Sequence, residues 1–293
     1  MICEVGPRDG LQNEKRILSI SHKVELIDRL TEAGFKAIEV GSFMNPIAVP
    51  QMADTDEVFK RINQKPGVEY GAIIANLKGV ERAFLCGCKK VKLNVSTSIQ
   101  HNLANLNKTP EESIESFKIC AETARNKGMD ISGSISMAFG SPWEHRIPIS
   151  IVRKLVDSYL DTGIIEISLS DTSGMAMPNQ VYSLCTEMKI HYPEIKWILH
   201  FHNTRGMGIA NIIAGMQTGI TFFDSSIGGI GGCPFVPGAA GNVSSEDLIH
   251  MCDGMGIETG INLDMLIDIA KTVETLVGHE LSNGGGMIKW TRS

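Results

Sequence analysis

Two histidines lie two residues apart in an otherwise apolar segment, KWILHFHN (196–203). If this segment is a strand, His200 and His202 share one face while Phe201 points to the other, because side chains alternate along a strand. Two imidazoles about 7 Å apart along one face can chelate a metal ion. The same pair could instead be buried and hydrogen-bonded in a core, and the spacing alone leaves both interpretations open.

Further polar residues follow or interrupt other apolar segments. Arg8 and Asp9 follow ICEV, Glu39 lies within KAIEVGSF, and Asp171 ends IIEISLSD. Each also has a structural interpretation: a tight turn with a surface ion pair, an inward carboxylate paired with an arginine, and a helix cap. Imidazole, carboxylate and amide ligands together would form a mixed nitrogen–oxygen site suited to Mg²⁺, Mn²⁺ or a similar ion.

A glycine-rich stretch, SSIGGIGGCPFVPGAAGNVSSED (225–247), carries Cys233 and Asn242. Its backbone N–H groups could bind a phosphate. Alternatively, the stretch is a mobile lid in which Cys233 acts as a proton donor or nucleophile, or a flexible surface loop with a chance cysteine. No GK[ST] sequence is present, so the stretch is not a P-loop.

The elements that must position these residues alternate along the chain. Segments at 21–34 and 111–128 have helical spacing of apolar residues, with Gly34 expected to cap the first and Thr109 the second. Eight strand-like segments separated by helical ones predict a parallel (β/α)₈ TIM barrel, with a doubly wound open sheet as the main alternative. No GxGxxG motif follows the first strand, which disfavours a nucleotide-binding open sheet. The predicted strands cover residues 2–5, 36–43, 68–75, 90–97, 130–139, 164–171, 196–203 and 220–227.

We expect a single catalytic domain over residues 1–293, with the barrel at about 1–255 and a C-terminal helical extension at about 263–278. In such a barrel the catalytic residues lie at the carboxyl ends of the strands and in the loops that follow them. Lys89, Lys90 and Lys92 fall within a predicted strand and are expected to lie on its solvated edge.

Composition excludes several classes of protein. A formal net charge of −6 disfavours nucleic-acid binding, which needs a concentrated basic surface. No apolar run approaches the roughly 20 residues of a membrane helix, and no signal peptide is visible. The seven cysteines are scattered without a disulfide pattern, and the closest pair, Cys86 and Cys88, is expected to be buried thiols. These features indicate a reducing, cytoplasmic location.

Three motifs resemble 3-hydroxy-3-methylglutaryl-CoA (HMG-CoA) lyases. They are EVGPRDGLQNEK (4–15), HFHNTRG (200–206) and GGIGGCPFVPGAAGN (228–242), and the resemblance extends over essentially the whole chain. The family belongs to a larger group of metal-dependent barrel lyases and carboligases. The cysteine-containing motif is highly specific, whereas the first motif and the segment at 166–174 alone would be shared with isopropylmalate and homocitrate synthases.

The resemblance assigns roles to individual positions. It implies an arginine, Arg8, that stabilises the transition state, a catalytic loop cysteine, Cys233, and further catalytic residues at Glu39, Asp171 and Glu246. Substrate contacts are implied for Arg8, Gln12, Glu39 and Arg205. The implied metal ligands are Asp9, His200, His202 and Asn242.

The implied reaction is a retro-Claisen cleavage of HMG-CoA to acetyl-CoA and acetoacetate, which would place the enzyme in leucine catabolism and ketone-body formation. A divalent ion, Mg²⁺ or Mn²⁺, would lower the pKa of the tertiary hydroxyl. Arg8 would stabilise the enolate, and Cys233 would protonate it. A metal-bound histidine, Asp171 or water could be the base. The resemblance also implies an acyl-CoA substrate and a homo-oligomer, expected to be a dimer.

Some positions depart from the common family pattern. Asn203–Arg205 replaces Asp-Thr-Tyr, Val40-Gly41 follows Glu39 where a threonine is usual, Ser141 stands where cysteine is common, and the loop after residue 97 lacks an expected acid. These changes leave the metal and cysteine positions intact but open the choice of acyl substrate. A related 3-hydroxyacyl-CoA such as citramalyl-CoA, which would release pyruvate, is the alternative. A carboligase of the isopropylmalate-synthase type and a non-catalytic metal- or acyl-CoA-binding protein are the further alternatives.

Overall fold

The computed structural model describes residues 1–232 and 241–281. Eight parallel strands form a closed barrel, in which each strand pairs with the next and the last pairs with the first. This closure confirms the predicted (β/α)₈ barrel and excludes the open doubly wound sheet. The strands are β1 (Ile2–Glu4), β2 (Ala37–Ser42), β3 (Glu69–Ile74), β4 (Lys90–Ser96), β5 (Asp130–Ser136), β6 (Glu166–Asp171), β7 (Lys196–Phe201) and β8 (Phe222–Ser225).

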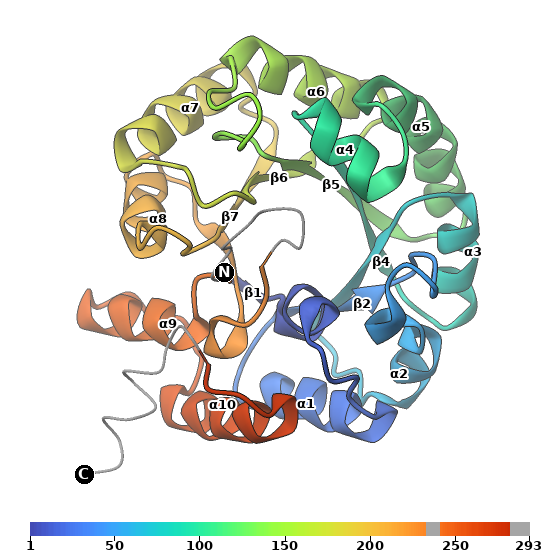
Figure 1. Ribbon diagram of the computed structural model, residues 1–293, viewed down its shortest axis with the longest axis vertical. Helices are drawn as coiled ribbons and strands as arrows, with labels where there is room; N and C mark the ends of the chain where they lie inside the picture. The colour runs from blue at the N-terminus through green and yellow to red at the C-terminus, as the bar shows by residue number, and fades with distance from the viewer. Residues whose placement is uncertain (233–240, 282–293) are drawn as a thin grey trace.

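Helices surround the barrel as an outer ring (Figure 1), and the short α4 follows β4 and packs against β4 and α5. The expected C-terminal helix is present as α10, which packs beside α1. Among the described residues, none of the helices has the length and apolar character needed to cross a membrane. The helices are α1 (Ile20–Glu32), α2 (Thr55–Arg61), α3 (Leu77–Leu85), α4 (Ile99–Leu106), α5 (Pro110–Asn126), α6 (Ile149–Asp161), α7 (Pro178–His191), α8 (Gly208–Gln217), α9 (Ser245–Gly254) and α10 (Leu263–Val277).

The helix ends follow local sequence chemistry. Thr109 accepts a hydrogen bond from the Glu112 N–H, and the Glu112 carboxylate accepts one from the Thr109 N–H, which forms a capping box at the start of α5. The prediction for the end of α1 is off by one residue. Ala33 is the cap, and Gly34 follows it with a φ of +112°, a conformation that favours glycine.

The prediction that Lys90 and Lys92 lie on a solvated edge is wrong. A closed barrel has no edge strand, and the alternation of β4 directs both side chains into its interior, while Lys89 is exposed. Near the amino ends of the strands, the Lys90 ammonium forms ion pairs with Glu69 and Glu166. The barrel interior is therefore charged, whereas most (β/α)₈ barrels fill it with branched apolar side chains.

Candidate active site

A cluster of possible metal ligands lies at the carboxyl ends of β7 and β1. The Nε2 atoms of His200 and His202 are 3.1 Å apart, and His202 Nε2 is 3.9 Å from Oδ2 of Asp9. One ligand atom from each of these three buried residues falls within 4.8 Å of the others. Phe201 points away and packs against Phe139, as the strand alternation predicts. Two facing imidazole nitrogens beside a carboxylate are a donor set that fits a divalent cation.

Asn242 is brought to the same cluster from the segment that follows β8. Its Nδ2 donates to Asp9 Oδ2 at 2.7 Å and to the Ile230 carbonyl at 3.0 Å. Residue 242 also forms an isolated β-bridge with His202. Gly231 has a φ of +120°, and a Cβ atom there would collide with Asn242 Nδ2. The glycine at this position is therefore required for the close approach of the asparagine.

The electrostatics of the cluster keep Asp9 and His202 deprotonated. Burial alone would raise the pKa of Asp9, but Arg8 and the two histidines outweigh it and lower that pKa to about 2. Burial and the neighbouring His200 lower the pKa of His202 to about 3. At neutral pH the site thus presents a carboxylate and a neutral imidazole, the forms that bind metal ions.

Asp224 on β8 orients the first histidine of the cluster. Its Oδ2 lies 3.3 Å from Nδ1 of His200. A proton on Nδ1 that faces this carboxylate leaves the lone pair of Nε2 directed at the cluster, which is the usual arrangement of a metal-binding histidine and its carboxylate partner. Asp224 was not singled out from the sequence, although an acid within the apolar run ITFFDSSI is the kind of signal used for Glu39.

Arg8 reaches the cluster from a single π-helical turn, Gly6–Gly10, after β1. Its Nη1 is 2.5 Å from Asp9 Oδ1, and its Nε donates to Glu39 Oε1. The expectation that Glu39 is an inward carboxylate paired with an arginine is confirmed, whereas the Arg8–Asp9 pair is largely buried and lies at the barrel mouth, not on the surface. A guanidinium held by two carboxylates is fixed in orientation and permanently charged.

Two buried glutamates hold the loops that carry these residues. The Glu4 carboxylate accepts hydrogen bonds from the N–H groups of Gly6 and Ile227 and from the Ser245 hydroxyl, which ties the loop after β1 to the one after β8. Both carboxylate oxygens of Glu246 lie 2.9 Å from the Gly228 nitrogen. Burial raises the pKa of Glu4 to about 7 and that of Glu246 to about 8. Glu4 was not singled out from the sequence.

An open cavity of about 510 Å³ leads to the cluster. Arg8, Asp9, His200 and His202 line one side, together with Gln12, whose Nε2 donates to Asp9 Oδ1 at 3.2 Å. The cavity is also lined by amide and hydroxyl groups, namely Asn94, Ser134, Ser136 and Ser170. A cavity of this size, with a fixed cation and a metal-ligand cluster at one wall, suits an acidic organic substrate.

Several residues assigned from the resemblance do not line this cavity, namely Glu39, Asp171, Arg205, Asn242 and Glu246, and Cys233 cannot be placed in it. Both Asp171 oxygens accept hydrogen bonds from backbone N–H groups of the loop after β6, those of Met175 and Ala176. The helix-cap interpretation of Asp171 is wrong, because α7 begins later, with Met177 as its N-cap and no side-chain hydrogen bond at that cap. Arg205 is exposed and donates to the carbonyls of Ser173 and Gly174. Their catalytic and substrate roles remain predictions. Cys233 lies outside the described residues, and its role also remains a prediction.

The closed barrel and its buried, mouth-facing cluster define an enzyme of the (β/α)₈-barrel class with a site that fits a divalent metal ion. The family model described as HMGL-like matches residues 1–273. The (R)-citramalyl-CoA lyase of Chloroflexus aurantiacus is 40% identical, with 96% of this chain and 92% of the relative covered. The mitochondrial hydroxymethylglutaryl-CoA lyase of Homo sapiens is also 40% identical, over 96% of this chain and 87% of the relative.

Solved structures of HMG-CoA lyases also resemble this chain. An HMG-CoA lyase from Acinetobacter baumannii, solved with coenzyme A and 3-methylmalate, superposes with a TM-score of 0.94 at 41% identity and covers 98% of this chain and 94% of that chain. The chain belongs to the HMGL-like family and is a carbon–carbon lyase.

Proposed function

We propose that the protein cleaves HMG-CoA to acetyl-CoA and acetoacetate. The observation that carries the proposal is the fixed guanidinium of Arg8 beside the Asp9–His200–His202 cluster, at the wall of a cavity that is open to an acyl-CoA. Hydroxymethylglutaryl-CoA lyases among the relatives support the acyl group, and a related structure solved with coenzyme A supports the thioester.

The residues have separate roles in this proposal. Asp9, His200, His202 and Asn242 would hold Mg²⁺ or Mn²⁺, which would acidify the tertiary hydroxyl of the substrate when bound. The hydroxyl passes its proton to the base, which would be a histidine of the cluster, Asp171 or water. The C2–C3 bond then breaks, C3 becomes the ketone of acetoacetate, and the bonding electrons form the enolate of acetyl-CoA.

Arg8 would stabilise this enolate, because its charge is always present and its orientation is fixed by Asp9 and Glu39. Gln12 would contact the substrate from the cavity wall, and the thiol of Cys233 would return a proton to the enolate carbon. Glu246 would act by holding the loop at Gly228. The proposal includes a homodimer, as the family resemblance implies.

Citramalyl-CoA is the second candidate substrate. A citramalyl-CoA lyase matches this chain as closely in sequence as the HMG-CoA lyases do. The same cleavage applied to citramalyl-CoA releases pyruvate in place of acetoacetate.

A product assay tests both candidates. The purified protein is given HMG-CoA or citramalyl-CoA with Mg²⁺ or Mn²⁺, and acetyl-CoA, acetoacetate and pyruvate are measured. We expect acetyl-CoA and acetoacetate from HMG-CoA, and no product from the Asp9→Asn control. Pyruvate from citramalyl-CoA alone would transfer the proposal to that substrate, and failure to cleave either thioester would refute it.

A further inference from the structure

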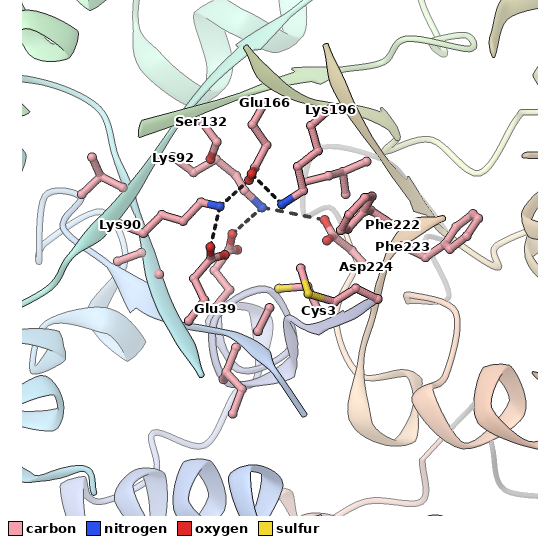
Figure 2. Close-up of a pocket in the computed structure, with 18 residues that line it drawn as sticks. Cys3, Glu39, Lys90, Lys92, Ser132, Glu166, Lys196, Phe222, Phe223 and Asp224 are labelled. Carbon is pink, nitrogen blue, oxygen red and sulfur yellow. Dashed lines mark hydrogen bonds and ion pairs between the residues drawn. The ribbon is translucent and has the colours of Figure 1, made fainter. Parts of the chain in front are cut away.

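Lys92 occupies an unusual place in the barrel. It lies on β4, across the barrel from the metal-ligand cluster, and its side chain lines both the open cavity and a second cavity at the base of the barrel. Figure 2 shows its ammonium between Glu39 and Asp224. The Nζ atom is 2.7 Å from Glu39 Oε2 and 3.8 Å from Asp224 Oδ2.

The two carboxylates that flank Lys92 each bind a residue of the active site on their other side. Glu39 accepts from Nε of Arg8, and Asp224 lies 3.3 Å from Nδ1 of His200. The contacts close into a ring, because Arg8 also pairs with Asp9, and Asp9 approaches His202. In order, the ring runs Arg8, Asp9, His202, His200, Asp224, Lys92, Glu39 and back to Arg8.

The ring contains an excess of carboxylates when Lys92 is left out. Asp9, Glu39 and Asp224 then face the single cation of Arg8. Buried carboxylates need a partner charge, since an unpaired one is strongly disfavoured in a low-dielectric interior. Burial would lower the pKa of Lys92, but Asp224 and Glu39 outweigh burial and raise it, so the ammonium stays charged.

We propose that Lys92 is a positioning residue for the lyase reaction: it holds Glu39 against Arg8, and it supplies the positive charge that keeps the Arg8–Glu39 pair able to stabilise an anion. The inference rests on the proposed function, because it concerns the enolate formed there. It assigns a role to an interior residue that neither the sequence motifs nor the family resemblance singled out.

The proposal predicts opposite effects on turnover and on metal binding. Loss of the ammonium makes the ring more negative by one charge, which disfavours the enolate and favours a bound cation. A unit charge removed at about 6–10 Å, at an effective dielectric constant near 20, changes a rate by roughly 10- to 100-fold. General damage to the fold would instead weaken metal binding and turnover together.

The test compares Lys92→Met with Lys90→Met. The two lysines lie on the same strand and face, and each pairs with two acidic groups, but Lys90 meets Glu69 and Glu166 at the base of the barrel. Mn²⁺ affinity is measured by calorimetry on the metal-free proteins, and kcat and KM are measured at saturating Mn²⁺. Thermal unfolding reports the stability of each variant.

We expect kcat of Lys92→Met to fall by about 10- to 100-fold while Mn²⁺ binds at least as tightly as to the native protein. Lys90→Met should keep kcat and metal affinity within about threefold and change stability alone. If methionine at position 92 prevents folding, Lys92→Gln provides the same charge removal with a hydrogen-bond donor retained for Glu39.

Two results would overturn the proposal. One is native kcat in the position-92 variant. The other is a parallel loss of kcat and metal affinity, which would assign Lys92 to structural support. Failure of the proposed function is distinguishable, because the native protein would then cleave neither thioester while the Mn²⁺ titrations could still be carried out.

Discussion

Replacing Asp224 with asparagine should weaken metal binding without unfolding the barrel. Asparagine keeps an oxygen that can accept the His200 Nδ1 proton, so the tautomer that presents Nε2 is retained. The charge is lost, however, and Lys92, 3.8 Å from the same carboxylate, is left with Glu39 as its partner in this ring. Loss of an outer carboxylate partner of a metal-binding histidine typically reduces metal affinity or activity by about 10- to 100-fold.

The geometry places Asp224→Asn and Asp224→Leu at different points of that range. Because the asparagine preserves the acceptor, we expect about a tenfold loss, or about 1.4 kcal/mol. Leucine removes both the acceptor and the charge, so we expect about a 100-fold loss, or about 2.8 kcal/mol. The measurement is a calorimetric Mn²⁺ titration of the metal-free proteins, followed by kcat at saturating Mn²⁺.

Glu166→Gln is the matched control for Asp224. Glu166 is also an interior carboxylate that pairs with lysines, Lys90 and Lys196, but it lies at the opposite end of the barrel (Figure 2). Its loss should reduce stability and leave the Mn²⁺ affinity unchanged. Native affinity in Asp224→Leu would refute the reasoning, since it would mean that His200 needs no carboxylate to present Nε2.

Two further predictions concern the arginine and a buried glutamate. Arg8→Lys should lower kcat by about 10²- to 10³-fold, because a compact ammonium cannot bond both Asp9 and Glu39. The control is Arg82→Lys, which alters an ion pair with Asp56 in the outer ring of helices. Equal kcat values in the two variants would contradict the role of Arg8. Glu246→Gln should change the pH dependence of stability. The folded-state pKa of Glu246 is raised to about 8, so its protonated form stabilises the fold fully below about pH 4.5, and this contribution is lost as pH rises through 8. At about 1.4 kcal/mol per pKa unit, the free energy of unfolding of the variant should rise by a few kcal/mol relative to that of the native protein between pH 5 and 9. The measurement is thermal unfolding as a function of pH. If the unfolding temperatures of the two proteins change in parallel over that range, Glu246 does not titrate as described.

Sequence patterns were sufficient for the architecture because each element carries its own signal. The predicted strands all overlap observed ones, and the helix from 111 corresponds to α5, whose capping box is local chemistry. The placement of the histidine pair could likewise be predicted, since strand alternation puts His200 and His202 on one face whatever the rest of the fold is. The open question, ligand or core histidine, needed Asp9 from the other end of the chain.

Lys92 and Asp224 could not be placed in the same way. Strand alternation gives two faces but does not state which is inside, and a lysine normally indicates the solvated face. Only barrel closure brings the inward side chains of β4, β8 and β2 together, so that Lys92 meets Asp224 and Glu39. Long-range charge pairing of this kind leaves no local pattern, which is why the lysines of β4 were misassigned.

The charges of the ring explain why a barrel interior with so many ionised groups can exist. Arg8 and Lys92 face the three carboxylates of Asp9, Glu39 and Asp224, so these five side chains together carry one net negative charge. A divalent cation converts this to one net positive charge, which a substrate carboxylate then neutralises. Because buried net charge is costly in either sign, the ring favours a cation first and an anionic substrate second. The same residues that would be a burden to stability thus give the site its preference for a metal-bound organic acid.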